Sequence, residues 1–145
     1  MALSSKLDHA GFRVYCLLGD GEIEEGQIWE AAMTAAHYKL DNLCVIIDNN
    51  NLQIDGEIRD VMNPYPIADK FKSFGFNVFE VDGHNMQDLI EVFNKAKKVK
   101  NMPTAVIAKT VKGKGVSFME NKVEWHGKAP NDEEFKNAIK ELERI

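Results

Sequence analysis

Four short apolar runs, alternating with segments of helical periodicity, constrain the fold of this chain more than any other feature. The runs are rich in β-branched, aromatic and leucine side chains and span residues 13–18, 43–47, 76–81 and 104–108. They show little polar alternation, which is typical of strands buried on both faces of a parallel sheet. Strands that alternate with helices predict an α/β fold, a three-layer α/β/α arrangement around a mainly parallel sheet.

Helical segments are expected between and after these runs. Apolar residues recur at spacings of three and four in segments 28–35, 89–96 and 135–142, which predicts three amphipathic helices. Asn131 and Glu134 precede the last segment at a spacing close to that of a capping box. Shorter helices are expected at about 2–9 and 66–74. No repeat or linker interrupts the pattern, so residues 1–145 are expected to form a single domain.

Charge and composition argue against several classes of protein. The formal net charge is −5, with acidic and basic residues interspersed, whereas a nucleic-acid-binding protein needs a basic face. No apolar stretch reaches the roughly 18 residues of a membrane span, and the N-terminus lacks the apolar core of a signal peptide. Cys16 and Cys44 each lie within an apolar run and are expected to be buried and reduced. The chain is therefore expected to be cytoplasmic, with neither nucleic acid nor membrane as a partner.

A first polar cluster follows the first predicted strand. Gly19, Asp20 and Gly21 stand where that strand should end, and ligands of parallel α/β sheets bind at the carboxyl ends of strands. Flanking glycines allow the backbone to turn sharply and to approach a ligand closely. The helix that follows would present free N–H groups to an anion. By itself, however, the tripeptide is better explained by an ordinary turn in which Asp20 caps the helix.

A second polar cluster, at residues 48–56, follows the next predicted strand. Twenty-seven residues, 22–48, separate Gly21 from Asn49. This spacing accommodates one helix and one strand, so both clusters should emerge at the same edge of the sheet. Carboxylate, amide and carbonyl oxygens are the hard ligands that suit Mg²⁺ or Ca²⁺. An asparagine-rich loop can also be a simple turn.

Together the clusters resemble the fingerprint of thiamine-diphosphate enzymes, and the resemblance covers essentially the whole chain. It is closest to the transketolase family in its two-subunit bacterial form, in the N-terminal, diphosphate-binding subunit. The segments that carry it are GDG at 19–21, EGQIWEAA at 25–32, IDG at 54–56, VDGH at 81–84, KTVKGKG at 109–115 and WHG at 125–127. The resemblance implies a thiamine-diphosphate-binding fold and two-carbon ketol transfer between sugar phosphates.

The resemblance also implies a ligand set. The side chains of Asp20 and Asn50 and the carbonyl of Leu52 would hold Mg²⁺ or Ca²⁺, and these residues would bind thiamine diphosphate together with Gly19 and Gly21. Gly21 would donate its amide to the diphosphate.

Two further residues are implied to be catalytic. His126 matches a family histidine near the diphosphate and the substrate, and Glu25 matches a glutamate buried near the contact that links paired sites. Taken without the resemblance, His126 could be a plain loop histidine, and Glu25 could merely complement a helix dipole.

The resemblance further implies what this sequence does not contain. The family's domain normally has a longer segment ahead of this point, so the domain is expected to be N-terminally truncated relative to the family. The glutamate that activates the aminopyrimidine belongs to another domain, which is a separate chain in split enzymes. The expected partners are therefore a sugar phosphate substrate in the complex, a second copy of the chain, and a pyrimidine-binding C-terminal transketolase subunit.

Two alternatives remain open, and a third is disfavoured. The chain could be a non-catalytic remnant or a binding and dimerisation module. It could belong to another thiamine-diphosphate enzyme, such as a deoxyxylulose-phosphate synthase or a dehydrogenase E1 component. A dinucleotide-binding domain fits poorly, because the segment after the first strand lacks the third glycine of G-x-G-x-x-G. If the chain is the transketolase subunit that it resembles, it is expected to be inactive alone and to need the pyrimidine-binding partner for activity.

Overall fold

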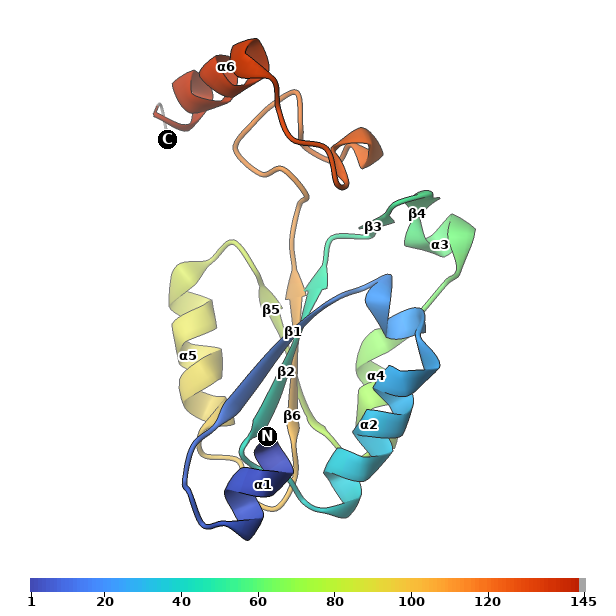
Figure 1. Cartoon of the computed structure of the whole chain (residues 1–145), viewed down its shortest axis with the longest axis vertical. Helices are drawn as coiled ribbons and strands as arrows, with labels where there is room; N and C mark the ends of the chain where they lie inside the picture. The colour runs from blue at the N-terminus through green and yellow to red at the C-terminus, as the bar shows by residue number, and fades with distance from the viewer. Residues whose placement is uncertain (144–145) are drawn as a thin grey trace.

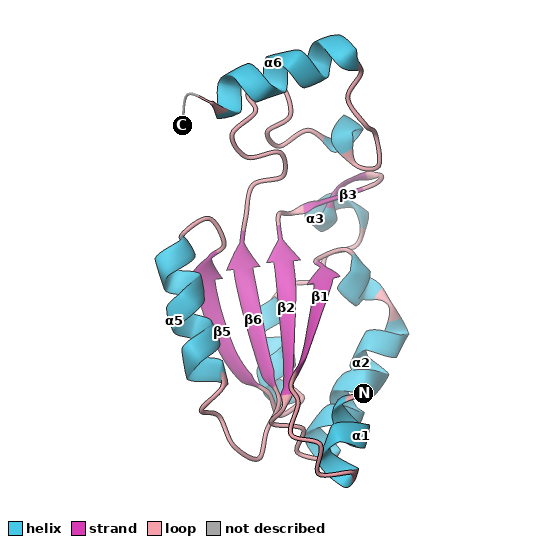
Figure 2. Ribbon diagram, turned by 60° about the vertical axis from the view of Figure 1, so that its left-hand side comes forward, coloured by secondary structure: helices cyan, strands magenta, loops and turns pink. Residues whose placement is uncertain are grey.

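The computed structural model describes residues 1–143, and its centre is a four-stranded parallel sheet (Figures 1 and 2). The strands are β1 Val14–Gly19, β2 Leu43–Asn49, β5 Asn77–Asp82 and β6 Thr104–Lys109, in the order β1-β2-β6-β5. All three strand pairs are parallel. The four predicted strands are confirmed, with ends at most two residues from the predicted ones.

Helices cover both faces of this sheet, which confirms the three-layer α/β arrangement. The longer ones are α2 Gly26–His37, α4 Ile67–Ser73 and α5 Met86–Ala96, and Figure 1 shows α5 on one side of the sheet with α2 and α4 on the other. The short helix α1 Ala2–Leu7 packs into the same core as α2 and α4. No helix within residues 1–143 is both long and apolar enough to cross a membrane.

The side chains of β2 alternate between two hydrophobic cores. Val45 and Ile47 pack with α2 and α4, while Cys44 packs on the α5 face. This two-residue period is the geometry of a strand, and here both faces are apolar because both are covered.

The remaining elements lie above the carboxyl ends of the strands. They are β3 Leu52–Gln53, β4 Gly56–Glu57, α3 Ile58–Val61, the 3₁₀ turn η2 Val123–Trp125 and α6 Asp132–Leu142. Figure 1 shows them at the top of the molecule, over the edge where the two polar clusters emerge.

Two expectations about local structure are wrong. No α-helix follows Gly21 directly: Glu22–Glu24 forms the single 3₁₀ turn η1, and α2 begins only at Gly26. Cys44 is buried as expected, and its burial raises the pKa of the thiol to about 11. Cys16, by contrast, is exposed, because β1 is the outermost strand in the described sheet and its neighbours Tyr15 and Leu17 are exposed too.

The predicted capping box is present at the start of α6. The side chain of Asn131 accepts hydrogen bonds from the backbone N–H groups of Glu133 and Glu134, at 3.0 and 2.9 Å. In return the carboxylate of Glu134 accepts from the backbone N–H of Asn131 at 2.8 Å. This bond, helped by nearby Lys128, lowers the pKa of Glu134 below its ordinary 4.5.

The capping box predicts a specific pH dependence. Because the folded-state pKa of Glu134 lies below the unfolded one, its stabilising effect is fully present above pH 4.5 and is lost as the pH falls through the depressed value. The difference in thermal midpoint between wild type and Glu134→Gln should therefore shrink between pH 6 and pH 3. Glu133→Gln is the matched control, since its carboxylate takes no part in the box. A wild-type advantage that persists unchanged at the acidic end would contradict the prediction.

Candidate functional site

Six residues predicted to bind cofactor or metal line one cavity of about 400 Å³. They are Gly19, Asp20, Gly21, Asn50, Leu52 and His126. The cavity lies at the carboxyl ends of β1 and β2, where Gly19 and Asp48 are direct partners across the two strands. The register thus brings the two polar clusters together, as expected for neighbouring parallel strands.

Asp20 is the most deeply buried polar group of the cavity, with 1% of its surface exposed. Its Oδ2 accepts hydrogen bonds from Asn49 Nδ2 at 2.9 Å and from the backbone N–H of Asn51 at 2.6 Å. Burial raises the pKa of the Asp20 carboxyl, although these hydrogen bonds act in the opposite sense. No ion pair with a Lys, Arg or His side chain involves Asp20 in the described part of the chain. A desolvated carboxylate without a cation is a group that a metal ion would stabilise in its charged form.

Asn50 and Leu52 are tied together by a local turn. The backbone N–H of Leu52 donates to Asn50 Oδ1 at 3.0 Å, and Asn50 Nδ2 donates to Asp48 Oδ2 at 3.1 Å. Asp48 also accepts a hydrogen bond from Thr110 Oγ1. An amide oxygen has two lone pairs, so Asn50 Oδ1 retains one for a cation.

The cavity has an excess of negative charge. Its lining includes the carboxylates of Asp20, Glu22, Asp48 and Asp55 but only Lys112 and His126 on the basic side. A diphosphate would be repelled by such a lining unless a divalent cation neutralised part of it.

The oxygen donors of the cavity suit Mg²⁺, which needs few protein ligands. They do not suit a metal ion whose ligands are all protein side chains. Within residues 1–143, no group of three or more His, Cys, Asp or Glu side chains is arranged to hold a metal. The available donors are one carboxylate, one amide oxygen and backbone carbonyls, and Mg²⁺ typically completes such a set with phosphate oxygens and water.

Gly21 stands at a point of close approach. A Cβ atom added there would lie 2.8 Å from Gln53 Oε1 and 3.0 Å from Gln53 Cβ, so a larger residue would force Gln53 to move. The N–H of Gly21 donates to Asp20 Oδ1 at 3.0 Å. Its donation to a diphosphate therefore stays a prediction.

The structure does not bring Glu25 to the other predicted residues. Glu25 is exposed at the N-cap of α2 and is not among the cavity-lining residues. Its catalytic role stays a prediction. His84 joins two loops, because its Nε2 accepts from the backbone N–H of Val111 at 2.8 Å.

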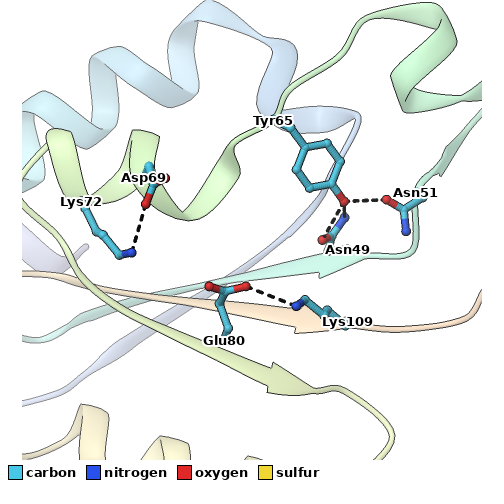
Figure 3. Close-up of polar contacts among 7 residues, drawn as sticks. All are labelled: Asn49, Asn51, Tyr65, Asp69, Lys72, Glu80 and Lys109. Carbon is cyan, nitrogen blue, oxygen red and sulfur yellow. Dashed lines mark hydrogen bonds and ion pairs between the residues drawn. The ribbon is translucent and has the colours of Figure 1, made fainter.

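The sequence analysis did not identify the residues outside the cavity that position Asp20 through hydrogen bonds. Asn49 is 3% exposed and contacts both Asp20 and Tyr65, while the hydroxyl of Tyr65 also contacts Asn51 (Figure 3). Asn49 carried a weak signal as a member of the asparagine run. Tyr65 carried none, since it lies 16 residues further along the chain and outside every motif.

Relatives with known names match the full chain but only part of their own length. The chain is 44% identical to one subunit of the apulose-4-phosphate transketolase of Phocaeicola vulgatus, over 100% of this chain and 52% of the relative. It is 40% identical to the 6-deoxy-6-sulfo-D-fructose transketolase subunit SqwG of a Clostridium species, over 99% of this chain and 52% of the relative. The chain thus spans about half the length of these curated relatives.

Solved structures and a family profile give the same result. The transketolase of Campylobacter jejuni superposes with a TM-score of 0.84 at 33% identity, over 91% of this chain and 21% of that one. A transketolase of Pichia stipitis gives 0.87 at 28% identity, over 98% and 22%. The profile described as "Transketolase, thiamine diphosphate binding domain" matches residues 5–143. The chain therefore belongs to the transketolase family, as a thiamine-diphosphate-binding domain.

Proposed function

We propose that this chain binds thiamine diphosphate through Mg²⁺ and serves as the diphosphate-binding part of an enzyme that transfers two-carbon ketol units between sugar phosphates. The observation that carries the proposal is the convergence of Asp20, Asn50 and Leu52 in one acidic cavity with Gly19, Gly21 and His126. An acidic lining accepts a diphosphate only with a divalent cation between them, and Mg²⁺ or Ca²⁺ suits these oxygen donors.

Each residue has a defined task in this proposal. Asp20 and Asn50 bind the metal by side chain and Leu52 by its carbonyl, while the absence of a side chain at Gly21 lets the diphosphate approach. His126 and Lys112 are the basic groups that line the cavity and would face the phosphate or the sugar. When bound, the cofactor supplies the carbon nucleophile of ketol transfer.

A partner chain and a sugar substrate are also proposed. The two relatives described above are named as transketolase subunits, and one is named for a sugar phosphate. By analogy, a pyrimidine-binding C-terminal subunit completes the site, and the complex acts on sugar phosphates in the cytoplasm.

Cofactor binding is the direct test. Asp20→Ala and the near-isosteric Asp20→Asn should weaken Mg²⁺-dependent binding of thiamine diphosphate by at least 10- to 100-fold, roughly the effect of losing even an outer partner of a metal site. Isothermal titration of thiamine diphosphate in the presence of Mg²⁺ measures this loss. Thermal midpoints of the free proteins show whether each variant is folded.

Asp69→Ala is the matched control. Asp69 is exposed and pairs with Lys72 at 3.0 Å (Figure 3), outside the proposed site. It should bind cofactor as wild type does. Equal cofactor affinity in wild type and both Asp20 variants would show that the metal site is misassigned.

A binding or dimerisation module without catalysis is the second candidate. The exposed apolar side chains Tyr15 and Leu17, 47% and 69% exposed on β1, favour a contact with another chain. A second copy of this chain is the proposed occupant. Sedimentation over micromolar concentrations, together with the titration above, separates the candidates: self-association with no cofactor binding by wild type would favour the module.

A further inference from the structure

We propose that Tyr65 is a positioning residue for the metal site: through Asn49 and Asn51, its hydroxyl fixes the orientation of the Asp20 carboxylate. The inference rests on the proposed function, since it concerns how the same site is held. Tyr65 itself touches neither the proposed metal nor the proposed cofactor, because it does not line their cavity.

Four groups form a closed ring of hydrogen bonds. Asn49 Nδ2 lies 2.9 Å from Asp20 Oδ2 and 3.0 Å from the Tyr65 hydroxyl. That hydroxyl lies 2.5 Å from Asn51 Oδ1, and the backbone N–H of Asn51 lies 2.6 Å from Asp20 Oδ2. Figure 3 shows the hydroxyl of Tyr65 placed between the two asparagine side chains.

The number of protons determines the direction of these bonds. Asn49 Nδ2 has two protons, which suffice for Asp20 Oδ2 and the Tyr65 oxygen. Tyr65 has one hydroxyl proton, and the shorter distance assigns it to Asn51 Oδ1 rather than to Asn49 Oδ1 at 3.1 Å. Every donor in the ring is then used, and both donors to Asp20 Oδ2 come from residues that Tyr65 contacts. Asp20 Oδ1, which meets only the N–H of Gly21 among the hydrogen bonds of the described residues, is the atom best placed to bind a cation.

Tyr65 is itself held firmly on the far side of the site. Its ring packs against the hydrophobic core, and the guanidinium of Arg59 lies 4.7 Å from the ring centroid. Its backbone N–H donates to Asn63 Oδ1 at 3.0 Å, while Lys70 Nζ donates to the Pro64 carbonyl at 2.6 Å. Tyr65 lines a separate cavity of about 410 Å³ together with Asn49 and Asn51. Its hydroxyl therefore contacts the two asparagines from outside the cavity of the proposed metal site.

Asn51 needs such support. Its φ of +66° lies in the left-handed region, which asparagine tolerates but does not favour. Its side chain is exposed, and its bond to Tyr65 fixes that side chain while the backbone N–H faces Asp20.

Tyr65→Phe isolates the effect of the hydroxyl. It retains the ring, its packing and the contact with Arg59. We expect Mg²⁺-dependent thiamine diphosphate binding to weaken on the order of 10-fold, the lower end of the range for outer partners of metal sites. Tyr38→Phe is the matched control: it also removes a tyrosine hydroxyl, but from the C-cap of α2, in the connection that leads to the start of β2 rather than at its carboxyl end.

Two measurements distinguish a role of Tyr65 in positioning the Asp20 carboxylate from a general effect on the stability of the fold. The thermal midpoint of free Tyr65→Phe should stay close to that of Tyr38→Phe. Mn²⁺ used in place of Mg²⁺ should give a different paramagnetic resonance spectrum in Tyr65→Phe than in wild type, because the geometry of its oxygen ligands changes. A loss of affinity that merely parallels a large fall in the thermal midpoint overturns the inference, as does an affinity and spectrum equal to those of Tyr38→Phe.

Asn51→Gly provides a second route to the same test. Glycine accepts the positive φ and removes the acceptor of the Tyr65 hydroxyl. The free-energy loss in the double variant Tyr65→Phe/Asn51→Gly should be smaller than the sum of the two single losses, since both changes break the bond between Tyr65 and Asn51; strictly additive losses overturn the inference. If Tyr65→Phe does not fold, a wild-type affinity in Asn51→Gly overturns it. Failure of wild type to bind cofactor at all would instead reject the proposed function.

Discussion

Ketol transfer is expected to be undetectable when the purified chain is assayed alone with thiamine diphosphate, Mg²⁺ and a ketose–aldose pair. Thiamine chemistry needs the cofactor held at both ends, and the cavity around Asp20 offers ligands suited to the diphosphate end. The resemblance described in the sequence analysis implies that the glutamate that activates the aminopyrimidine belongs to another domain. A reacting ring left mobile forfeits much of the roughly 7–11 kcal/mol that positioning can supply.

The assay has two arms and one control. Any turnover should require addition of a pyrimidine-binding C-terminal transketolase subunit. The same mixture with Asp20→Asn in place of wild type should show no turnover, since the metal ion that binds the diphosphate would then be lost. Robust turnover by the chain alone would reject the proposed division of the site between two chains.

The fold could be predicted from the sequence because its signals are local. Strands buried on both faces produce continuous apolar runs, and amphipathic helices repeat at three and four residues. The convergence of Asp20 and Asn50 was equally predictable, since it needs only two strands that are parallel neighbours. The pairing of β1 with β2 provides this condition.

Other features depend on contacts that no local pattern encodes. The exposure of Cys16 follows from the position of β1 at the edge of the described sheet. The hydrophobic periodicity of a sequence predicts strands but not their order in a sheet. The hydrogen bonds of Tyr65 to Asn49 and Asn51 span 16 and 14 residues. They arise only after the loop before α4 folds back over the end of β2.

The aromatic cluster under α2 and α4 is expected to be the most sensitive part of the core. Phe71 is 1% exposed, and its ring centroid lies 5.2 Å from that of Trp29 and 5.4 Å from that of Phe76. Trp29 in turn donates from Nε1 to the carbonyl of Ile23 at 2.8 Å, within the η1 turn that follows Gly21. The core therefore supports the backbone at the candidate site directly.

Phe71→Ala should lower the free energy of unfolding by about 3–5 kcal/mol, because it removes the buried ring and leaves a cavity between three elements. That loss is a large fraction of the roughly 5–15 kcal/mol that typically stabilises a domain. Urea unfolding followed by tryptophan fluorescence measures it, with Trp29 as a reporter next to the substitution. Phe135→Ala is the matched control: its ring is 54% exposed on α6, so the same change there should cost no more than about 0.5 kcal/mol. A Phe71→Ala protein as stable as Phe135→Ala would show that the aromatic cluster does not stabilise this face of the sheet.

Phe71→Ala should also weaken cofactor binding under conditions where most of the protein is still folded, because the hydrogen bond from Trp29 to Ile23 stabilises η1. Phe135→Ala should leave cofactor binding unchanged.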